Sequence, residues 1–461
     1  MNVALPEIAA MLGVPYSGAN ATVLRVSTDS RNIQPGDLFI ALRGEKFDGG
    51  AFAAQALQQG AAGVVLDASQ APDMAAAIRV DDTRLALGRL AAAWRARFDI
   101  PVVAITGSNG KTTVKEMLAA VLRAEVGSDA AVLATEGNLN NDIGVPLMML
   151  RLRDSHRYAV LEMGMNHLGE IDYLTRLARP DVALVNNALS AHIGLLGSVE
   201  AIARAKGEIF NGLGEGGIAI LNADDPHLPM WRDMNARRTV LTFALSAPAA
   251  VSGTWQPRNY GSALTLKLPN ATLEIALQVP GEHNVRNALA AATAAFALDV
   301  AHSSIVAGLE AYSGIKGRLV RTPALHGSTF IDDTYNANPD SVKAALSVLA
   351  TQPGKKILVL GDMGELGAEG PAMHAQIGLA ARAAGVDRMF ALGELTRESV
   401  RAFGKGAMHF ERIQELLAEL ENELDSGTTV LVKGSRFMQM ERVVQSFRED
   451  PAAARPGNEV H

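Results

Sequence analysis

The sequence predicts an α/β fold of three domains in series. A small N-terminal α/β domain is expected over residues 1–83, a central P-loop-type domain with a mostly parallel sheet and helices on both faces over 84–316, and a C-terminal Rossmann-like α/β domain over 317–455. Two observations predict this class. Apolar β-branched runs alternate with Ala- and Leu-rich helical stretches, as in βαβ units. The 461 residues also make about three domains of ~150 residues each.

The first domain is expected to contain a strand, a helix and a second strand, at residues 37–42, 51–59 and 63–66. A helix over 82–97 follows. Leu85, Leu87, Leu90 and Trp94 give this helix an apolar stripe at helical spacing. We expect it to connect the first domain to the second.

The central domain opens with a continuous apolar run at 101–105, typical of a parallel strand buried on both faces. Helical stretches separate the strands that follow, at 158–163, 182–186 and 217–221. Between 240 and 279 the residues alternate between apolar and polar, which predicts an antiparallel hairpin element before a helix over 282–298. The βαβ pattern then resumes with strands at 329–332, 356–360, 388–392 and 428–432, and we expect the Pro- and Ala-rich tail from 450 to be frayed.

Composition excludes several functions. The net charge is −7, from 42 Lys and Arg against 49 Asp and Glu, so nucleic acid is not the expected partner, because phosphate backbones require a basic face. With no cysteine, the chain cannot form disulfides, thiolate zinc sites or a cysteine nucleophile. It has neither a basic leader nor an uncharged apolar stretch of about 18 residues, which a membrane helix needs. We expect a soluble cytoplasmic protein without a membrane span.

The most specific local pattern is Ala-Ile-Thr-Gly-Ser-Asn-Gly-Lys-Thr-Thr at residues 104–113, between a predicted strand and a predicted helix. There the backbone amides and the helix N-terminus can bind phosphate. Gly107 and Gly110 let the backbone approach the phosphates, Lys111 supplies charge for the β/γ oxygens, and the Thr112 hydroxyl can bind Mg²⁺. The residue five positions before Gly110 is not the usual P-loop glycine. The alternative is a strand-to-helix turn that binds nothing.

Polar side chains also stand near the ends of other predicted strands. Glu162 lies at the end of the strand at 158–163, where open α/β sheets bind ligands, and a carboxylate there can hold Mg²⁺. His192 follows the next strand, so the two side chains could face one crevice. The alternative is that they are solvated, which is the more common state of a lone loop histidine. Lys206, on a predicted helix, has from its pattern alone the features of an exposed lysine.

Asparagines form another group. Those within 138–141 and 186–187 lie at element ends, where they can cap turns or contact a base. Asn284 and Asn287 share one face of the helix over 282–298, and N-capping explains only one of these two amides.

Three polar junctions follow strands of the C-terminal domain, at residues 332–339, 361–367 and 433–436. The adjacent acids Asp332 and Asp333 would repel each other unless a cation or a hydroxyl lies opposite. Because parallel strands share a carboxyl edge, we expect the junctions to form a site that faces the phosphate loop. The alternative is ordinary loop chemistry.

Over nearly its whole length the chain resembles the Mur ligases, the ATP-dependent amide-forming enzymes of peptidoglycan precursor synthesis. The runs that carry the resemblance are Asp332-Asp333-Thr334-Tyr335-Asn336-Ala337-Asn338-Pro339, Leu360-Gly361-Asp362-Met363-Gly364-Glu365-Leu366-Gly367 and Asn140-Asn141-Asp142-Ile143-Gly144-Val145-Pro146. They look most like the member that adds D-alanyl-D-alanine. The Asp-Asn-Pro-Arg signature of the member that adds the third peptide residue is absent. The missing P-loop glycine is usual in this family.

The resemblance implies ATP and Mg²⁺ as cofactors and UDP-N-acetylmuramoyl-tripeptide and D-alanyl-D-alanine as substrates; we expect a monomer. By position it implies an ATP loop of Gly107, Ser108, Asn109, Gly110, Lys111, Thr112 and Thr113. It implies metal ligands Thr112, Glu162, His192 and a carbamylated Lys206, and catalytic roles for Lys111, Lys206, His192 and Glu162. It implies adenine, phosphate or ribose contacts from His283, Asn284, Asn287, Arg318 and Asp333. It implies substrate contacts from Ser27, Thr28, Asp29, Ser30 and Arg31 at the UDP end and from Asn336 and Asn338.

The implied reaction transfers the γ-phosphoryl group of ATP to the tripeptide carboxylate, and the dipeptide amine then attacks the acyl phosphate. Lys111 and Mg²⁺ would offset the charge, and domain closure would exclude water. Three alternatives compete. A folylpolyglutamate synthetase would not need the first domain, and a nucleotide-gated binding protein or simple ATPase leaves the C-terminal polar junctions unexplained. An NAD-binding oxidoreductase fails because no Gly-x-Gly-x-x-Gly follows the strand at 101–105.

Overall fold

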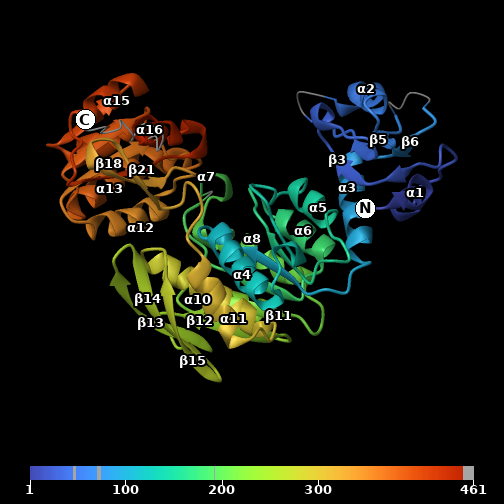
Figure 1. The fold of residues 1–461 in the computed structure, drawn as a ribbon, viewed down its shortest axis with the longest axis horizontal. Helices are drawn as coiled ribbons and strands as arrows, with labels where there is room; N and C mark the ends of the chain where they lie inside the picture. The colour runs from blue at the N-terminus through green and yellow to red at the C-terminus, as the bar shows by residue number, and fades with distance from the viewer. Residues whose placement is uncertain (45–47, 70–73, 192, 450–461) are drawn as a thin grey trace, which may run out of the picture.

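The structure is a computed structural model that describes residues 1–44, 48–69, 74–191 and 193–449. Its N-terminal domain, blue in Figure 1, is built on a four-stranded parallel sheet. The strands are β3 (Arg25–Ser27), β4 (Asp37–Ile40), β5 (Gly63–Asp67) and β6 (Ala77–Val80). The other elements are a strand pair, β1 (Val3–Ala4) and β2 (Thr22–Val23), and the helices α1 (Leu5–Leu12) and α2 (Ala53–Gln58). The strand–helix–strand order predicted here is confirmed.

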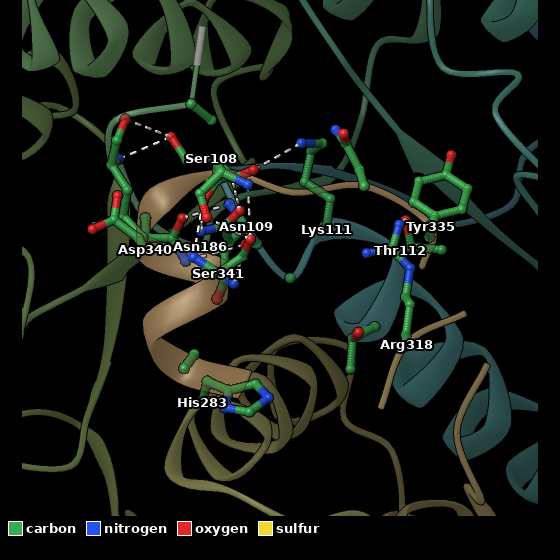
Figure 2. Close-up of a pocket in the computed structure, with 18 of the residues that line it drawn as sticks. Ser108, Asn109, Lys111, Thr112, Asn186, His283, Arg318, Tyr335, Asp340 and Ser341 are labelled. Atoms are coloured by element: carbon green, nitrogen blue, oxygen red, sulfur yellow. Dashed lines mark hydrogen bonds between the residues drawn. The ribbon is translucent and has the colours of Figure 1, made fainter. Parts of the chain in front are cut away.

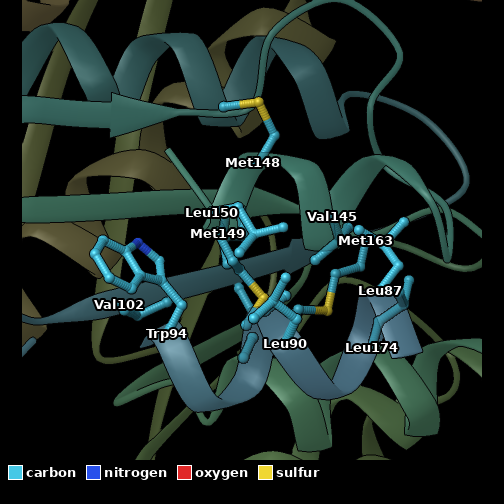
Figure 3. Close-up of a cluster of buried hydrophobic side chains, with 14 of the residues drawn as sticks. Leu87, Leu90, Trp94, Val102, Val145, Met148, Met149, Leu150, Met163 and Leu174 are labelled. Atoms are coloured by element: carbon cyan, nitrogen blue, oxygen red, sulfur yellow. The ribbon is translucent and has the colours of Figure 1, made fainter. Parts of the chain in front are cut away.

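Helix α3 (Thr83–Arg95) connects this domain to the next. Asp82 caps its N-terminus by accepting hydrogen bonds from the backbone N–H groups of two residues in the first turn, at 2.7 and 2.8 Å. Leu87, Leu90 and Trp94 are buried in one continuous core, which runs from α1 to the central sheet (Figure 3). Leu85, which the sequence placed in the same stripe, is instead 45% exposed, so the apolar stripe is narrower than predicted.

The central sheet has nine strands in the order β15-β14-β13-β12-β11-β10-β7-β9-β8. It is parallel from β8 to β13, and β14 and β15 continue it as antiparallel strands. The predicted hairpin is therefore an extension of the sheet. The strands are β7 (Val102–Thr106), β8 (Val132–Ala134), β9 (Tyr158–Glu162), β10 (Val182–Val185), β11 (Ile218–Asn222), β12 (Thr239–Ala244), β13 (Val251–Arg258), β14 (Gly261–Leu268) and β15 (Ala271–Leu277).

Helices cover both faces of this sheet, and β7 shows why its residues are uniformly apolar. Val102 and Ala104 enter the core that contains α3, whereas Val103 and Ile105 enter the core on the opposite face. The first face carries α5 (Gly144–Met149), α6 (Glu170–Ala178), α8 (Val199–Gly207) and α9 (Leu228–Met234). The second carries α4 (Lys111–Val126), α10 (Glu282–Ala297) and α11 (His302–Ala311).

Helix α11 packs against α4 with Gly308 at the point of closest approach. A Cβ atom on Gly308 would lie 2.3 Å from Val121 Cα. Glycine-to-alanine changes in a helix usually stabilise it by about 1 kcal/mol, but here the two backbones would have to separate. We therefore expect Gly308→Ala to lower the free energy of unfolding by about 2 kcal/mol, measured by urea denaturation. Gly214→Ala is the control, because a Cβ atom there meets nothing within 4 Å. Equal effects in the two variants would contradict the packing argument.

The C-terminal domain, orange and red in Figure 1, has a six-stranded sheet of order β16-β17-β21-β18-β19-β20, in which only β16 is antiparallel. Its strands are β16 (Val320–Pro323), β17 (Thr329–Asp333), β18 (Lys355–Gly361), β19 (Arg388–Leu392), β20 (Ala407–Phe410) and β21 (Thr428–Lys433). One face carries α12 (Pro339–Ala350), α13 (Gly370–Ala383) and α14 (Thr396–Phe403), and the other carries α15 (Ile413–Glu421) and α16 (Glu441–Phe447).

The predicted class of three α/β domains is confirmed. The boundaries between residues 83 and 84 and between 316 and 317 stay predictions, and the predicted frayed tail from 450 lies outside the described residues. Among the helices that the structure describes, none is both long and apolar enough to cross a membrane.

Candidate active site

A cleft of about 1010 Å³ lies between the central and C-terminal domains. It brings the phosphate loop together with segments that follow β9, β10, β11, β17, β18 and β21 (Figure 2). Many residues singled out by the sequence line it: Ser108, Asn109, Gly110, Lys111, Thr112, Thr113, Glu162, Asn284, Asn287, Arg318, Asp333, Asn336 and Asn338. The three polar junctions of the C-terminal domain therefore do face the phosphate loop.

The phosphate loop joins β7 to α4 and is held in shape by its own hydrogen bonds. Lys111 Nζ donates to the carbonyl oxygens of Gly107 and Ser108, at 2.7 and 3.3 Å. Gly110 has a φ of +81°, and a Cβ atom there would lie 2.3 Å from Asn287 Oδ1. Only glycine fits this position, because it tolerates both the left-handed backbone and the close approach.

Asparagine side chains that follow β10 and lie on α10 hold the phosphate loop in place. Asn187 accepts from the backbone N–H of Asn109 at 2.9 Å, and Asn186 donates to the Asn109 carbonyl at 2.9 Å and to Asn287 Oδ1 at 3.0 Å. Asn284 donates to a backbone carbonyl four residues earlier, at 2.8 Å. Helix α10 begins after Gly281 without a side-chain cap. The prediction that N-capping explains one of the two α10 asparagines is therefore wrong, and both belong to this buried network.

Glu162 presents a free carboxylate oxygen to the cleft. Its backbone N–H donates to Thr135 Oγ1 at 2.9 Å, and its Oε1 accepts from Asn140 at 2.8 Å. The other oxygen, Oε2, is buried and has no hydrogen-bond partner within the described residues. A buried, unpaired carboxylate oxygen is costly unless a cation neutralises it. This donor fits Mg²⁺, which usually takes one or two carboxylates and completes its shell with water and phosphate oxygens.

The other candidate metal ligands do not form a complete metal site with Glu162 within the part of the chain that the structure describes. Thr112 Oγ1 lines the cleft and accepts a hydrogen bond from Arg318 at 2.9 Å. His192 lies outside the described residues. Among the residues that are described, no three of the His, Asp and Glu side chains cluster as a ready-made metal cage. Water and phosphate oxygens would therefore have to complete any magnesium shell.

Lys206 is buried, with only 2% of its surface exposed, so the exposed lysine predicted from the helix pattern is wrong. No carboxylate in the described part of the chain forms an ion pair with it. Desolvation by burial, with repulsion from Lys111, holds the pKa of Lys206 well below its ordinary range. A lysine in this environment favours the neutral, nucleophilic amine.

The C-terminal domain forms one wall of the cleft, which we call the C-terminal wall. In it, each of the two adjacent acids at the end of β17 has a partner. Asp333 forms an ion pair of 2.6 Å with Lys433, and Asp332 accepts from the Thr334 hydroxyl at 2.6 Å. A cation and a hydroxyl thus lie opposite the two acids, as the sequence requires. Arg318 stacks on the ring of Tyr335, with its guanidinium carbon 4.3 Å from the ring centre.

Direct hydrogen bonds join the C-terminal wall of the cleft to the wall that the central domain forms. Asn338 caps α12 and also exchanges two side-chain hydrogen bonds with Asn109 of the phosphate loop, at 2.7 and 3.3 Å. Asp340 accepts from the hydroxyl of Ser190 at 2.5 Å. Figure 2 shows Asn109, Asp340 and Ser341 side by side at the start of α12. The C-terminal domain is therefore docked on the phosphate loop itself.

His283 lies at the start of α10, beside the cleft (Figure 2). Desolvation by burial lowers its pKa from 6.5 to about 4. The unfolded chain therefore takes up this proton first, so the stability that the neutral ring contributes is complete above about pH 6.5 and is lost as the pH falls towards 4.

We expect the wild-type free energy of unfolding to drop by about 2 kcal/mol more than that of His283→Asn between pH 7 and 4.5. Urea titrations at the two pH values measure this difference. His326→Asn, at a half-exposed histidine (54%), is the control and should keep the full pH dependence. An identical pH response in wild type and His283→Asn would contradict the prediction.

The predicted UDP-contacting segment is not part of this cleft. Ser27 is the last residue of β3 in the N-terminal domain, and Asp29 and Arg31 follow it in a short 3-10 turn, where they pair at 2.8 Å. Neither Thr28 nor Ser30 lines the cleft. Figure 1 shows the N-terminal domain at the opposite end of the central domain from the C-terminal domain.

Two residues that hydrogen-bond to Glu162 were not predicted as part of the site from the sequence. Thr135 was not singled out, although its hydroxyl accepts the backbone N–H of Glu162. Asn140 was noted only within an amide cluster at an element end, and its contact with the Glu162 carboxylate depends on the path of a long loop. The amide cluster was the available signal for Asn140, and Thr135 gave none.

Family models match all three domains: "Mur ligase family, catalytic domain" at 22–95, "Mur ligase middle domain" at 105–295 and "Mur ligase, glutamate ligase domain" at 317–436. The chain belongs to the Mur ligase family. It is 42% identical over 457 residues, covering 98% of this chain and 99% of the relative, to the UDP-N-acetylmuramoyl-tripeptide–D-alanyl-D-alanine ligase of Escherichia coli K12.

Solved structures agree with this relationship. A crystal structure of MurF from Acinetobacter baumannii is 36% identical, covers 97% of this chain and 98% of its own, and superposes with a TM-score of 0.89. The MurF ligase of Thermotoga maritima in complex with ADP is 27% identical, covers 91% and 96% of the two chains and has a TM-score of 0.81.

Proposed function

We infer that this chain is an ATP-dependent ligase that joins D-alanyl-D-alanine to UDP-N-acetylmuramoyl-tripeptide, forming the UDP-pentapeptide precursor of peptidoglycan with ADP and phosphate. The observation that carries this inference is the identity of 42% with the Escherichia coli enzyme across 98% of the chain. That match includes the N-terminal domain, which a simple ATPase or a folylpolyglutamate synthetase would not need. The cleft supports the same conclusion, because the phosphate loop and the polar C-terminal wall face each other in it.

We propose that Glu162 and Thr112 hold Mg²⁺, with His192 and Lys206 completing its surroundings. The free Oε2 of Glu162 supports the first assignment. Lys206 would take part as a carbamate, formed when its neutral amine adds CO₂. Its burial and lowered pKa favour that reaction. When bound, the metal offsets negative charge on the phosphate oxygens of ATP.

In the proposed reaction the tripeptide carboxylate attacks the γ-phosphorus of ATP, ADP leaves, and an acyl phosphate forms. The dipeptide amine then attacks the acyl carbon, phosphate leaves, and the amide bond is complete. Lys111 and the amides of residues 107–113 stabilise the charge on the transferred group. Asn284, Asn287, Arg318 and Asp333 are placed to hold the nucleotide, since they line the same cleft.

Residues 27–31 are proposed to hold the UDP end of the substrate, and Asn336 and Asn338 to contact its peptide end. Because residues 27–31 lie outside the cleft, we propose that the N-terminal domain moves towards the other two when the substrate binds to both regions. Such closure would also exclude water from the acyl phosphate. We further propose that the protein is a cytoplasmic monomer.

The decisive experiment incubates the purified protein with ATP, Mg²⁺ and the UDP-linked tripeptide, with and without D-alanyl-D-alanine. We expect ADP release to require both substrates and mass spectrometry to find the UDP-pentapeptide. ADP release that is indifferent to the dipeptide would reject the ligase and favour an ATPase. Turnover of a folate with glutamate in place of these substrates would favour the folylpolyglutamate alternative.

A further inference from the structure

The carboxylate of Glu162 is held by a single hydrogen bond among the residues that the structure describes. Glu162 is only 2% exposed. Asn140 Nδ2 donates to its Oε1 at 2.8 Å, whereas its Oε2 has no hydrogen-bond partner in the described part of the chain. The last torsion of a glutamate side chain has only broad preferences, so the carboxylate does not orient itself. The oxygen that is left for a cation therefore depends on Asn140.

The backbone of Glu162 is fixed by other contacts. Its N–H donates at 2.9 Å to the hydroxyl of Thr135, the residue that follows β8. The carbonyl of Thr135 accepts in turn from the buried Lys115 at 2.5 Å, and Lys115 also pairs with Glu116 at 2.5 Å. The charge of Lys115 is thus matched by Glu116 rather than by Glu162. These contacts hold the end of β9 in place and leave the orientation of the carboxylate to Asn140.

Asn140 is itself held independently of Glu162. Its backbone N–H donates to the carbonyl of Asn138 at 2.8 Å, and its own carbonyl accepts from the N–H of Gly164 at 2.8 Å. Gly164 leaves room for the amide, since a Cβ atom there would lie 3.1 Å from Asn140 Oδ1. The residue after Asn140 accepts from the first N–H of α5 at 2.8 Å. The amide therefore reaches Glu162 from a loop that is anchored on both sides.

A neutral donor suits a carboxylate that has to bind a cation. An amide N–H fixes one carboxylate oxygen without cancelling the negative charge, whereas a lysine or an arginine would form an ion pair and compete with a metal. Hydrogen bonds of this kind orient the ligands of metal sites, and their removal lowers metal affinity about 10- to 100-fold. The contact between Asn140 and Glu162 has the chemistry of such a hydrogen bond.

We propose that Asn140 is a positioning residue for the metal site, because it holds Oε1 of Glu162 and thereby leaves Oε2 free for the metal. The proposal rests on the proposed function, in which Glu162 binds Mg²⁺, and gives Asn140 a role that acts through this carboxylate alone. Asn140 therefore contributes to metal affinity and not to the affinity for nucleotide or tripeptide.

The test measures Mn²⁺ binding to the protein–ADP complex by electron paramagnetic resonance. The variants are Asn140→Ala, Glu162→Gln and the double variant. Asn211→Ala is the matched control, because its amide donates to the carboxylate of Asp172 at 2.6 Å on an exposed surface outside the cleft. We expect Asn140→Ala to raise the Kd of Mn²⁺ about 10- to 100-fold, and the control to match wild type. In the Glu162→Gln background, Asn140→Ala should add nothing.

Turnover gives a second readout. Because Glu162 itself remains, Asn140→Ala should raise the KM for Mg²⁺ by a similar factor, while excess Mg²⁺ restores most of kcat. The Kd of ADP without metal and the KM for the tripeptide should not change, which distinguishes this role from a general loss of structure. Asn140→Leu preserves the approximate volume of the side chain but not its donor. It should behave like Asn140→Ala, and it replaces that variant if circular dichroism shows that the alanine protein is unfolded.

The outcomes separate the proposed function from this inference. Unchanged Mn²⁺ affinity in Glu162→Gln contradicts the metal role of Glu162, on which the inference rests. If Glu162→Gln binds Mn²⁺ weakly but the Asn140 variants bind it as tightly as wild type, Asn140 does not position the carboxylate. The same conclusion follows if Asn140→Ala weakens Mn²⁺ binding equally with and without the carboxylate, or if it raises only the KM for the tripeptide.

Discussion

Lys111→Met is expected to lower kcat about a thousandfold, the largest effect of any change considered. The ammonium of Lys111 lies in the phosphate loop, where it donates to the carbonyls of Gly107 and Ser108. We propose that these contacts hold it beside the γ-phosphoryl group of bound ATP. Methionine preserves the length and apolar stem of the side chain but removes the cation, so the transferred group loses its main protein counter-charge.

The measurement is kcat for UDP-pentapeptide formation at saturating ATP, with nucleotide affinity followed separately by calorimetry. We expect the ADP dissociation constant to change much less than kcat, because the β-phosphate keeps the backbone amides of the loop. Lys115→Met does not serve as a control, since that lysine is buried and donates to Thr135. Lys267→Met, on strand β14 outside the cleft, is suitable. A Lys111 variant within tenfold of wild type would contradict the assigned role.

Lys206→Ala is expected to lower kcat about a hundredfold to a thousandfold. The reason is the proposed carbamate, which converts a buried amine into an anion that can face the metal. Lys206→Arg should be equally inactive, because arginine stays positively charged and does not form the carbamate. Lys206→Glu should recover only a small part of the activity, because it restores a carboxylate but on a side chain much shorter than carbamylated lysine.

Carbamylation itself is tested by nuclear magnetic resonance with ¹³C-labelled bicarbonate. We expect one carbamate signal in the wild-type protein and none in Lys206→Ala. A fully active Lys206→Ala variant would remove this residue from the mechanism. Activity that returns with arginine but not with glutamate would show that a cation is needed there, which is the opposite of the proposal.

Local patterns were enough to predict many of the elements and the phosphate loop, although they missed strands such as β3, β6, β8 and β20. The apolar run of β7 is buried on both faces, so its composition indicates a central parallel strand without knowledge of its neighbours. The loop after it has a sequence that suits one backbone path, since Gly110 is needed at its positive φ. The family resemblance implied metal-binding and catalytic roles for Lys206, which no local pattern indicated.

Other features depend on residues far apart in the chain. The burial of Lys206 comes from packing of α8 against the sheet, so a helix pattern that looks exposed was misleading. The pairing of Asn109 with Asn338 joins residues 229 positions apart, and either amide alone looks like a simple cap.

The sequence by itself therefore determined the fold class and the positions along the chain of many strands and of the phosphate loop, because each rests on neighbours within about one helix or strand. Only the tertiary structure decided which side chains share a wall of the cleft and which charges are already neutralised. Lys433 and Arg436 are three residues apart, but Lys433 pairs with Asp333 on β17 at 2.6 Å, whereas Arg436 pairs with Glu441 of α16 at 2.9 Å. That difference depends on strand β17 lying beside β21, a contact between segments about a hundred residues apart that no local pattern specifies.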